Sequence, residues 1–163
     1  MVGTRWGSRI AAASLLVMAA TGCAGTTGSQ PAPAEFVDPV LGMLNKGIIQ
    51  LDANIDRAAK RLDDLKQVPD TQDTLLQTLR AMDLQGLELH QRQWLVQRNH
   101  LSFAKVQLLA ARQHPGDKGR LLQEWASHER QYRQKMEAFK QQRSDLEHER
   151  LEAEAQLIEQ ALR

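Results

Sequence analysis

Five histidines and one cysteine are the residues of this sequence that could most readily bind a metal or act as nucleophiles. The pairs His128-Glu129 and His148-Glu149 begin like the zinc-binding helix of metalloproteases, but neither has the second histidine that completes the motif. A dimetal carboxylate site needs Glu-x-x-His on two helices, and that motif does not occur in the sequence. We therefore expect no metal site, and we interpret the histidines as solvated side chains on helix faces.

The sequence also lacks the motifs that position a phosphate, a haem or a catalytic nucleophile. It has no Gly-rich phosphate loop, no Cys-x-x-Cys pair, no haem attachment motif and no evident Ser-His-Asp grouping. Aromatic residues make up only 4% of the chain, which is low for a compact enzyme with a deep core. We therefore expect that the protein is not an enzyme and that it binds no cofactor.

The single cysteine, Cys23, follows a short apolar segment near the start of the chain. Residues 1–9 contain two arginines and no acid, and residues 10–20 are uninterrupted by charge. A membrane-spanning helix needs roughly 20 apolar residues, so this run is too short for a permanent anchor. Its length and basic flank instead predict a secretory signal peptide.

The end of that segment, Ala20-Thr21-Gly22-Cys23, resembles the lipobox of bacterial lipoproteins. Members of this class are cut before the cysteine, which carries a diacylglyceryl group, and the new amino terminus is often acylated as well. Ala20 departs from the leucine that is usual at its position. The resemblance implies a signal peptide over residues 1–22 and covalent lipid, such as palmitate, on Cys23. The alternative is an ordinary signal peptide cut at another small residue, which would leave a free thiol.

Lipidation would fix the location of the protein. Each buried CH₂ group contributes roughly 0.8 kcal/mol, so two or three acyl chains hold a protein stably on a membrane. In enteric-type sorting an aspartate after the cysteine retains a lipoprotein at the inner membrane, whereas Ala24 stands there in this chain. The resemblance therefore implies an anchor in the outer membrane, with the body in the periplasm.

Beyond the cysteine, the chain divides into a tether and a helical domain. Residues 23–38 are small, polar and proline-rich, as in a flexible linker. Residues 39–163 are rich in Leu, Ala, Gln, Glu and Arg, which is typical of long helices. Without residues 1–22 the chain has 19 basic and 20 acidic residues, so we expect no affinity for nucleic acid.

Apolar residues in the domain repeat at alternating intervals of three and four, which predicts three coiled-coil helices. Asp38-Pro39 is a cap-and-first-turn signal, so the first helix is expected over residues 39–67. After a break at Pro69, with Asp70 or Thr71 as the cap, the second runs over residues 73–113. The third runs from residue 118 to near 163 after the break at His114-Pro115-Gly116. The second helix has two apolar lines, so we expect it to contact both others.

Short breaks between long helices predict antiparallel hairpins, and therefore an all-α fold. Folding the last hairpin at its Pro-Gly turn places Gly86 opposite Leu146, with His100 in the seam at the level of Tyr132. Folding the first hairpin at Pro69 places Leu51 near Leu89.

In this register the shorter first helix starts at the level of His100 and Tyr132, several helical turns before the Pro-Gly turn that ends the second hairpin. That end is then expected to project alone by roughly 20 Å, as a two-helix tip facing the anchoring membrane or a partner. Its apolar and basic residues suit such a contact. The candidate partner-facing residues are Leu108, Leu109, Arg112, Lys118, Arg120, Leu121 and Trp125. The alternative is an ordinary two-helix core with a solvated turn.

Three functions are compatible with these features. The favoured hypothesis is a structural or adaptor lipoprotein that binds an envelope protein, or itself, through a helical seam. The second is a periplasmic chaperone or stress-type binder, although the Leu-Thr-x-x-Gln motif of small helical-hairpin chaperones is missing. The third is a wall tether resembling the small lipoprotein whose C-terminal lysine is linked to peptidoglycan, but this chain ends in Arg163.

Overall fold

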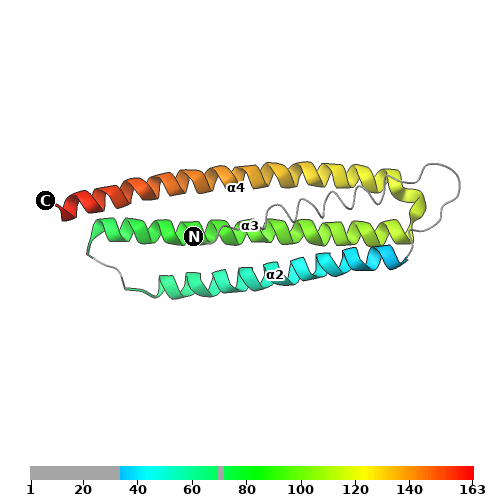
Figure 1. Ribbon diagram of the computed structural model, residues 1–163, viewed down its shortest axis with the longest axis horizontal. Helices are drawn as coiled ribbons and strands as arrows, with labels where there is room; N and C mark the ends of the chain where they lie inside the picture. The colour runs from blue at the N-terminus through cyan, green and yellow to red at the C-terminus, as the bar shows by residue number, and fades with distance from the viewer. Residues whose placement is uncertain (1–33, 70–71) are drawn as a thin grey trace.

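The computed structural model describes residues 34–69 and 72–163, which form three long helices and one short 3₁₀ turn. Helix α2 spans Ala34–Lys66, α3 spans Thr74–Gln113 and α4 spans Lys118–Ala161, with the 3₁₀ turn η1 at Pro115–Asp117. Neighbouring helices run antiparallel and the described residues contain no strand, which confirms the predicted all-α fold with a shorter first helix (Figure 1).

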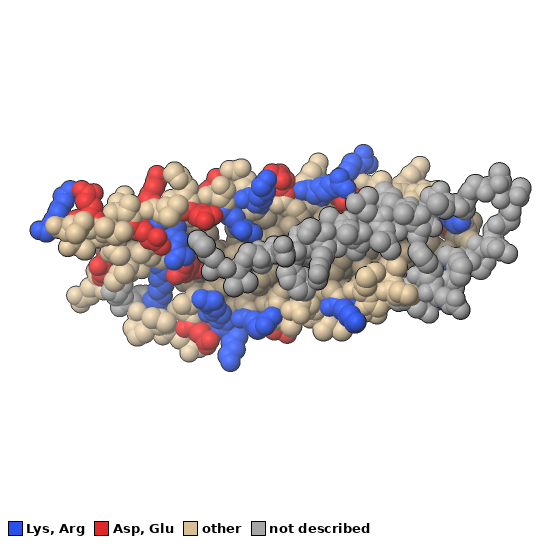
Figure 2. All heavy atoms as spheres, viewed as in Figure 1, with Lys and Arg blue, Asp and Glu red and all other residues tan. Residues whose placement is uncertain are grey.

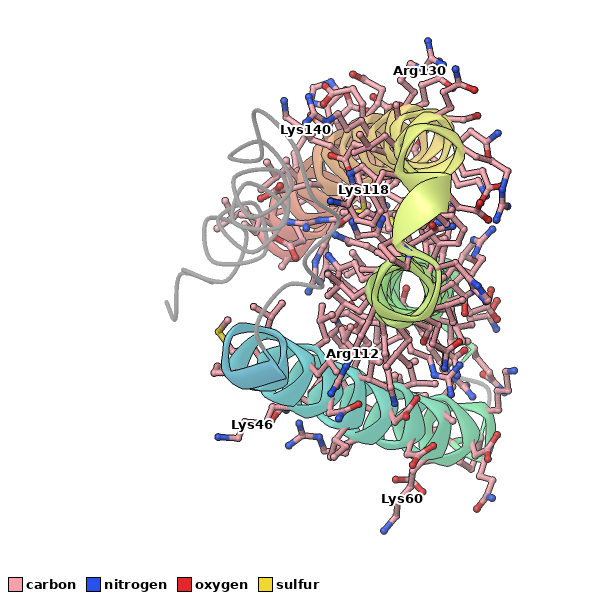
Figure 3. The ribbon with its side chains drawn as sticks, turned by 90° about the vertical axis from the view of Figure 1, so that its right-hand side faces the viewer. Lys46, Lys60, Arg112, Lys118, Arg130 and Lys140 are labelled. Atoms are coloured by element: carbon pink, nitrogen blue, oxygen red, sulfur yellow. The ribbon has the colours of Figure 1, made fainter. Side chains whose placement is uncertain are left out.

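Helix α3 lies in the middle of the arrangement. It packs along both α2 and α4, whereas α2 and α4 make few direct contacts with each other (Figure 3). The predicted pair of apolar lines on α3 is therefore confirmed. One line faces α4 and the other, which includes the buried Leu101, faces α2.

The main core lies in the half of the molecule nearer the α3–α4 turn, where all three helices contribute. It is a cluster of buried side chains with a few half-buried apolar neighbours, among them Trp94 and Phe103. The buried members are Val40, Leu44, Leu51, Leu101, Ala104 and Trp125. Toward the other end fewer side chains are buried, and the space between α2 and α4 is open.

The predicted start of the first helix was wrong. Helix α2 begins at Ala34, so Pro39 lies inside it and Asp38 is a helical residue rather than the cap. A proline this close to the start removes only one helical hydrogen bond, to the carbonyl four residues earlier, which a long helix tolerates.

The cap of α3 also differs from the prediction. Asp70 and Thr71 lie outside the described residues, and Asp73 is the N-cap. Its Oδ1 accepts hydrogen bonds from the backbone N–H of Leu75 at 2.8 Å and of Leu76 at 3.2 Å. Two of the unpaired donors of the first turn are thereby satisfied.

The register predicted for the α3–α4 hairpin is confirmed. A Cβ atom built on Gly86 would lie 3.5 Å from Leu146 Cδ2, and the rings of His100 and Tyr132 stack with centroids 3.9 Å apart. The Pro-Gly turn is tight enough for pairing to begin at once, because the His114 N–H closes α3 on Ala110 and the Asp117 N–H bonds the His114 carbonyl.

The register predicted for α2 was wrong by about eight residues, or ~12 Å along the helix axis. Gly47 lies against Leu101, and Asp52 forms an ion pair with Arg98 at 2.6 Å, whereas we expected residue 51 to lie near residue 89. The chain does not turn back sharply at Pro69. Helix α2 instead ends well short of the start of α3 along the length of the bundle (Figure 1).

The projecting tip is consequently absent. The shift and the earlier start of α2 together bring its first turns beside the last turns of α3 (Figure 1). Val40 and Leu44 of α2 share the core with Trp125 of α4, and Leu108 packs against that core. All three helices therefore reach this end of the molecule.

Candidate functional site

The residues expected to carry lipid lie outside the described part of the chain. Cys23 and the three residues before it, Ala20, Thr21 and Gly22, precede Ala34, where the description begins. Lipidation of Cys23 therefore stays a prediction.

The residues expected to form a partner-facing tip are brought together, but most of their apolar surface is covered. Leu121 and Trp125 are buried, and Leu108 and Leu109 are half-buried. Arg112, Lys118 and Arg120 are exposed around the turn, and Arg120 bonds Asp117 and Glu124 of its own helix end. Binding of a partner at this end stays a prediction. The surface that a partner would meet there includes the exposed Arg112, Lys118 and Arg120 rather than the buried Leu121 and Trp125.

The histidines are less solvated than expected. His114 and His148 are exposed, as predicted, but His90 and His128 are half-buried and His100 is only 2% exposed. His100 lies at the centre of a stack of rings, with Tyr132 at 3.9 Å and both Trp125 and His128 at 5.3 Å between centroids. Phe103 stacks on His128 at 4.0 Å.

The polar atoms of this ring cluster form a chain. His100 Nδ1 lies 3.3 Å from His128 Nδ1, and His100 Nε2 lies 3.5 Å from Glu129 Oε2. The contact between the two histidines is a hydrogen bond between neutral imidazoles, in which one Nδ1 donates and the other accepts. Glu129 Oε2 faces His100 but has no hydrogen-bond partner among the described residues. Glu129 is held in place by Arg133, whose Nε donates to Oε1 at 2.8 Å.

Burial sets the protonation of both imidazoles. It lowers the pKa of His100 from 6.5 to about 4, with the nearby Glu129 carboxylate opposing the shift and His128 adding to it. Burial also lowers the pKa of His128, and it raises the pKa of the Tyr132 phenol. The imidazoles are therefore neutral near pH 7, as the hydrogen bond between their Nδ1 atoms requires.

The cluster offers little space for a substrate. The hollow beside His128 has a volume of ≈ 60 Å³, which is room for about two waters. Within residues 34–69 and 72–163, no group of three or more His, Cys, Asp or Glu side chains is placed to hold a metal ion. We interpret the cluster as a polar part of the core whose protonation is coupled to folding.

The larger concave surface is a groove between α2 and α4, floored by α3, toward the open end of the bundle. Its volume is ≈ 690 Å³. Figure 2 faces the side on which α4 and α2 border this hollow, with uncharged atoms visible between them. The apolar floor and wall are formed by Met82, Gly86, Leu87, Trp94, Leu146 and Leu151.

Charged residues of both signs line the rim of the groove, with Arg61, Arg143 and Arg150 beside Asp83, Glu147 and Glu154. Arg150 bonds Asp83 and Glu154, each at 2.8 Å. Arg61 of α2 and Arg143 of α4 have no carboxylate partner among the described residues. Burial is the largest cause of the lowered pKa of His90, and the positive charge of Arg143 lowers this pKa further. The ring of His90 stacks on that of Trp94. The groove therefore combines an apolar floor with a rim that carries charges of both signs.

Two of the basic residues on α3 have structural roles that the sequence did not reveal. Arg80 donates to the carbonyls of Leu65 at 2.7 Å and of Pro69 at 3.2 Å, where α2 ends. Arg98 bonds Asp52, as described above. Both side chains therefore hold α2 against α3.

Comparisons of this chain with models of protein families, with curated proteins and with solved structures found no match. None of the helices within residues 34–69 and 72–163 is long and apolar enough to cross a membrane.

Proposed function

We propose that this protein is a lipoprotein of the bacterial cell envelope, anchored by lipid on Cys23, whose three-helix body acts as a structural or adaptor module. The observation that carries the anchor is the order of features at the start of the chain. A basic segment and a short apolar run are followed by small residues and the only cysteine. Anchoring in the outer membrane is part of this proposal.

The adaptor role is supported by the surface of the body. The apolar line on α3 that faces α2 is buried at Leu101 but only half-buried at Leu87 and Trp94, which line the groove. Apolar side chains between charged rims form a groove of the kind that takes the apolar face of an amphipathic helix. The burial of His100, its hydrogen bond to His128 and the small hollow beside His128 favour a core role over catalysis for the ring cluster.

The proposal is tested by fractionating membranes that contain the C-terminally tagged wild type or Cys23→Ser, followed by cross-linking and pull-down. We expect the wild type in the outer-membrane fraction with one reproducible partner, and the Cys23→Ser chain in the soluble fraction without it. Wild-type protein that is soluble would contradict the anchor, and an anchored protein without a cross-linked partner would contradict the adaptor role.

A chaperone-type binder is the second candidate, and the apolar floor of the groove is the observation that favours it. A chaperone would slow the aggregation of an unfolded test protein at stoichiometric ratio. Placing a charge on the groove floor by Leu87→Glu would remove that protection, whereas Leu122→Glu, at an exposed site near the other end, would not. An adaptor specific for one folded partner would leave aggregation unchanged.

A further inference from the structure

Two histidines face each other with a ring nitrogen each, between α3 and α4. His100 lies on α3 and His128 on α4, and their Nδ1 atoms are 3.3 Å apart. Other rings hold both imidazoles in place: Tyr132 stacks on His100 at 3.9 Å between centroids, and Phe103 stacks on His128 at 4.0 Å. The pair is therefore a fixed arrangement at the contact between the two helices of the hairpin.

The separation of the two Nδ1 atoms fits a shared metal ion as well as a shared proton. Two Zn–N bonds of about 2.0 Å at a tetrahedral angle place their nitrogen atoms about 3.3 Å apart. The distance between His100 Nδ1 and His128 Nδ1 is 3.3 Å, which is long for a hydrogen bond from nitrogen. A cation that replaces the shared proton therefore requires little movement of either ring.

A carboxylate behind the His100 ring favours the tautomer that a metal ion needs. Glu129 Oε2 faces Nε2 of His100 at 3.5 Å, on the side of the ring away from His128. A carboxylate in this position favours the proton on Nε2, so that Nδ1 carries the lone pair. Histidines that bind zinc usually have such a carboxylate behind the ring. Arg133 holds Glu129 in place, because its Nε donates to Oε1 at 2.8 Å.

The same carboxylate has a buried oxygen without a partner. Oε2 of Glu129 accepts no hydrogen bond from the described residues, which is unfavourable for a buried acceptor. A divalent cation on Nδ1 of His100 withdraws electron density from the ring and makes its Nε2–H a stronger donor toward Glu129. The negative charge of the carboxylate in turn offsets part of the charge of the cation. Metal binding therefore accounts for a polar atom that protein contacts alone leave unpaired.

Water would supply the remaining ligands of such an ion. His128 is half-buried and borders the hollow of ≈ 60 Å³, which has room for about two waters. The amide groups of Asn99 and Gln131 line this hollow and can hydrogen-bond those waters. Two imidazoles and two waters complete the four positions of zinc. Because the protein supplies only two ligands, the site is weaker than a structural zinc site with four.

We propose that His100 and His128 bind a divalent cation of the zinc type, which clamps α3 to α4. Imidazole suits zinc, copper and nickel, whereas magnesium and calcium prefer oxygen ligands. The sequence gave no sign of this site because its two histidines are 28 residues apart and meet only in the folded hairpin, whereas metal motifs were sought within single helices. The inference goes beyond the proposed function, because it depends neither on Cys23 nor on an envelope partner.

The test is a titration of the purified full chain with zinc chloride, followed by calorimetry and by the melting temperature. The chain carries Cys23→Ser, so that its only thiol does not bind zinc. We expect zinc to bind and the melting temperature to rise with zinc concentration, because an ion that binds the folded chain stabilises it. Magnesium chloride is expected to leave the melting temperature unchanged.

Variants of the same chain identify the ligands. His128→Phe keeps a ring beside Phe103 but removes one ligand, and we expect it to abolish the rise in melting temperature with zinc. Glu129→Gln keeps the size of the side chain without its charge and is expected to weaken zinc binding about tenfold. His148→Leu is the matched control, because His148 is exposed and lies 3.3 Å from Glu152, as in a weak surface site. We expect it to bind zinc as the parent chain does, and circular dichroism before zinc is added checks that each variant is folded.

The nitrogen resonances of the imidazoles give a readout that needs no ligand variant. We expect zinc to shift the Nδ1 resonances of His100 and His128 and to leave those of the exposed His148 in place. This measurement on the parent chain decides the question even if His128→Phe does not fold.

Zinc that leaves the resonances of His100 and His128 unshifted would overturn the proposal, and the pair would then be a hydrogen bond of the core only. A zinc effect that survives in a folded His128→Phe chain, or that is lost in His148→Leu, would also overturn it, because the ion would then bind elsewhere. Since Cys23 is replaced in every chain of this test, its outcome is independent of the anchor.

Discussion

The most specific prediction concerns His100 and the stability of the fold in acid. This imidazole is 2% exposed and lies among the rings of Tyr132, Trp125 and His128, so a proton added to it has little access to water. Burial lowers the pKa of His100 from 6.5 in the unfolded chain to about 4 in the folded protein.

The direction of the pH effect on stability follows from which state, folded or unfolded, binds the proton first as the pH is lowered. Between pH 6.5 and pH 4 the unfolded chain is protonated at this residue while the folded protein is not. The contribution of neutral His100 to stability is therefore present above pH 6.5, falls as the pH is lowered, and is lost below pH 4.

Its size can be worked out from the same two pKa values. Proton linkage makes the free energy of unfolding about 2 kcal/mol smaller at pH 5 than at pH 7, and the full loss at lower pH approaches about 3 kcal/mol. The lowered pKa values of His90 and His128 act in the same direction. Measurements above pH 5 avoid most of the titration of the carboxylates.

The assay is urea unfolding followed by circular dichroism at pH 7, 6 and 5, for the wild type, His100→Leu and His148→Leu. Leucine is similar in volume to histidine and does not titrate, while the exposed His148 serves as the matched control. We expect the stability of the wild type and of His148→Leu to fall with pH, and that of His100→Leu to fall by about 2 kcal/mol less. An equal pH dependence in all three chains would refute the reasoning.

Three further predictions concern the helix ends and the glycines. Arg80→Ala, which removes the donors to the Leu65 and Pro69 carbonyls, is expected to cost about 1 to 3 kcal/mol in urea unfolding. Arg92→Ala is the control, since within residues 34–69 and 72–163 Arg92 bonds a carbonyl of its own helix, and an equal loss there would contradict the bridging role. Asp73→Ala is expected to cost about 1 kcal/mol through loss of the α3 cap, with Asp73→Asn retaining most of it; equal losses would count against a capping role. Gly42→Ala, which meets nothing within 4 Å, is expected to raise the melting temperature by stabilising the helix by about 1 kcal/mol. Gly47→Ala, whose Cβ would lie 2.8 Å from Leu101 Cδ1, is expected to gain less or to lose stability, and an equal gain would contradict the packing of α2 on α3.

The sequence predicted the α3–α4 hairpin well because its determinants are local. The Pro-Gly turn fixes where pairing begins, and the apolar seams continue without interruption on both helices, so opposite residues can be counted from the turn. Gly86 against Leu146 and His100 against Tyr132 follow from that count.

The position of α2 could not be predicted in the same way. The count assumed a sharp reversal at Pro69, whereas the end of α2 is fixed by Arg80, which lies in the next helix and bonds Leu65. A regular heptad seam also fits its partner equally well after a shift by one repeat, so the pattern alone does not select the register.

Burial of the histidines and formation of the groove each depend on more than one helix. His100 has the spacing of a seam residue, but its ring stack needs side chains from both α3 and α4. The groove exists because α2 and α4 both pack on α3 and barely contact each other. The sequence periodicity of a single helix does not indicate whether its two neighbours contact each other.

The central claim is that lipid on Cys23 anchors this three-helix body. The most direct measurement is the intact mass of the protein isolated from membranes, together with mass analysis of its N-terminal peptide. We predict a mature chain that starts at Cys23 and carries a diacylglyceryl group on its sulfur, and an uncut, unmodified chain for Cys23→Ser. A chain that is cut elsewhere, or that retains a free Cys23 thiol, would contradict the account.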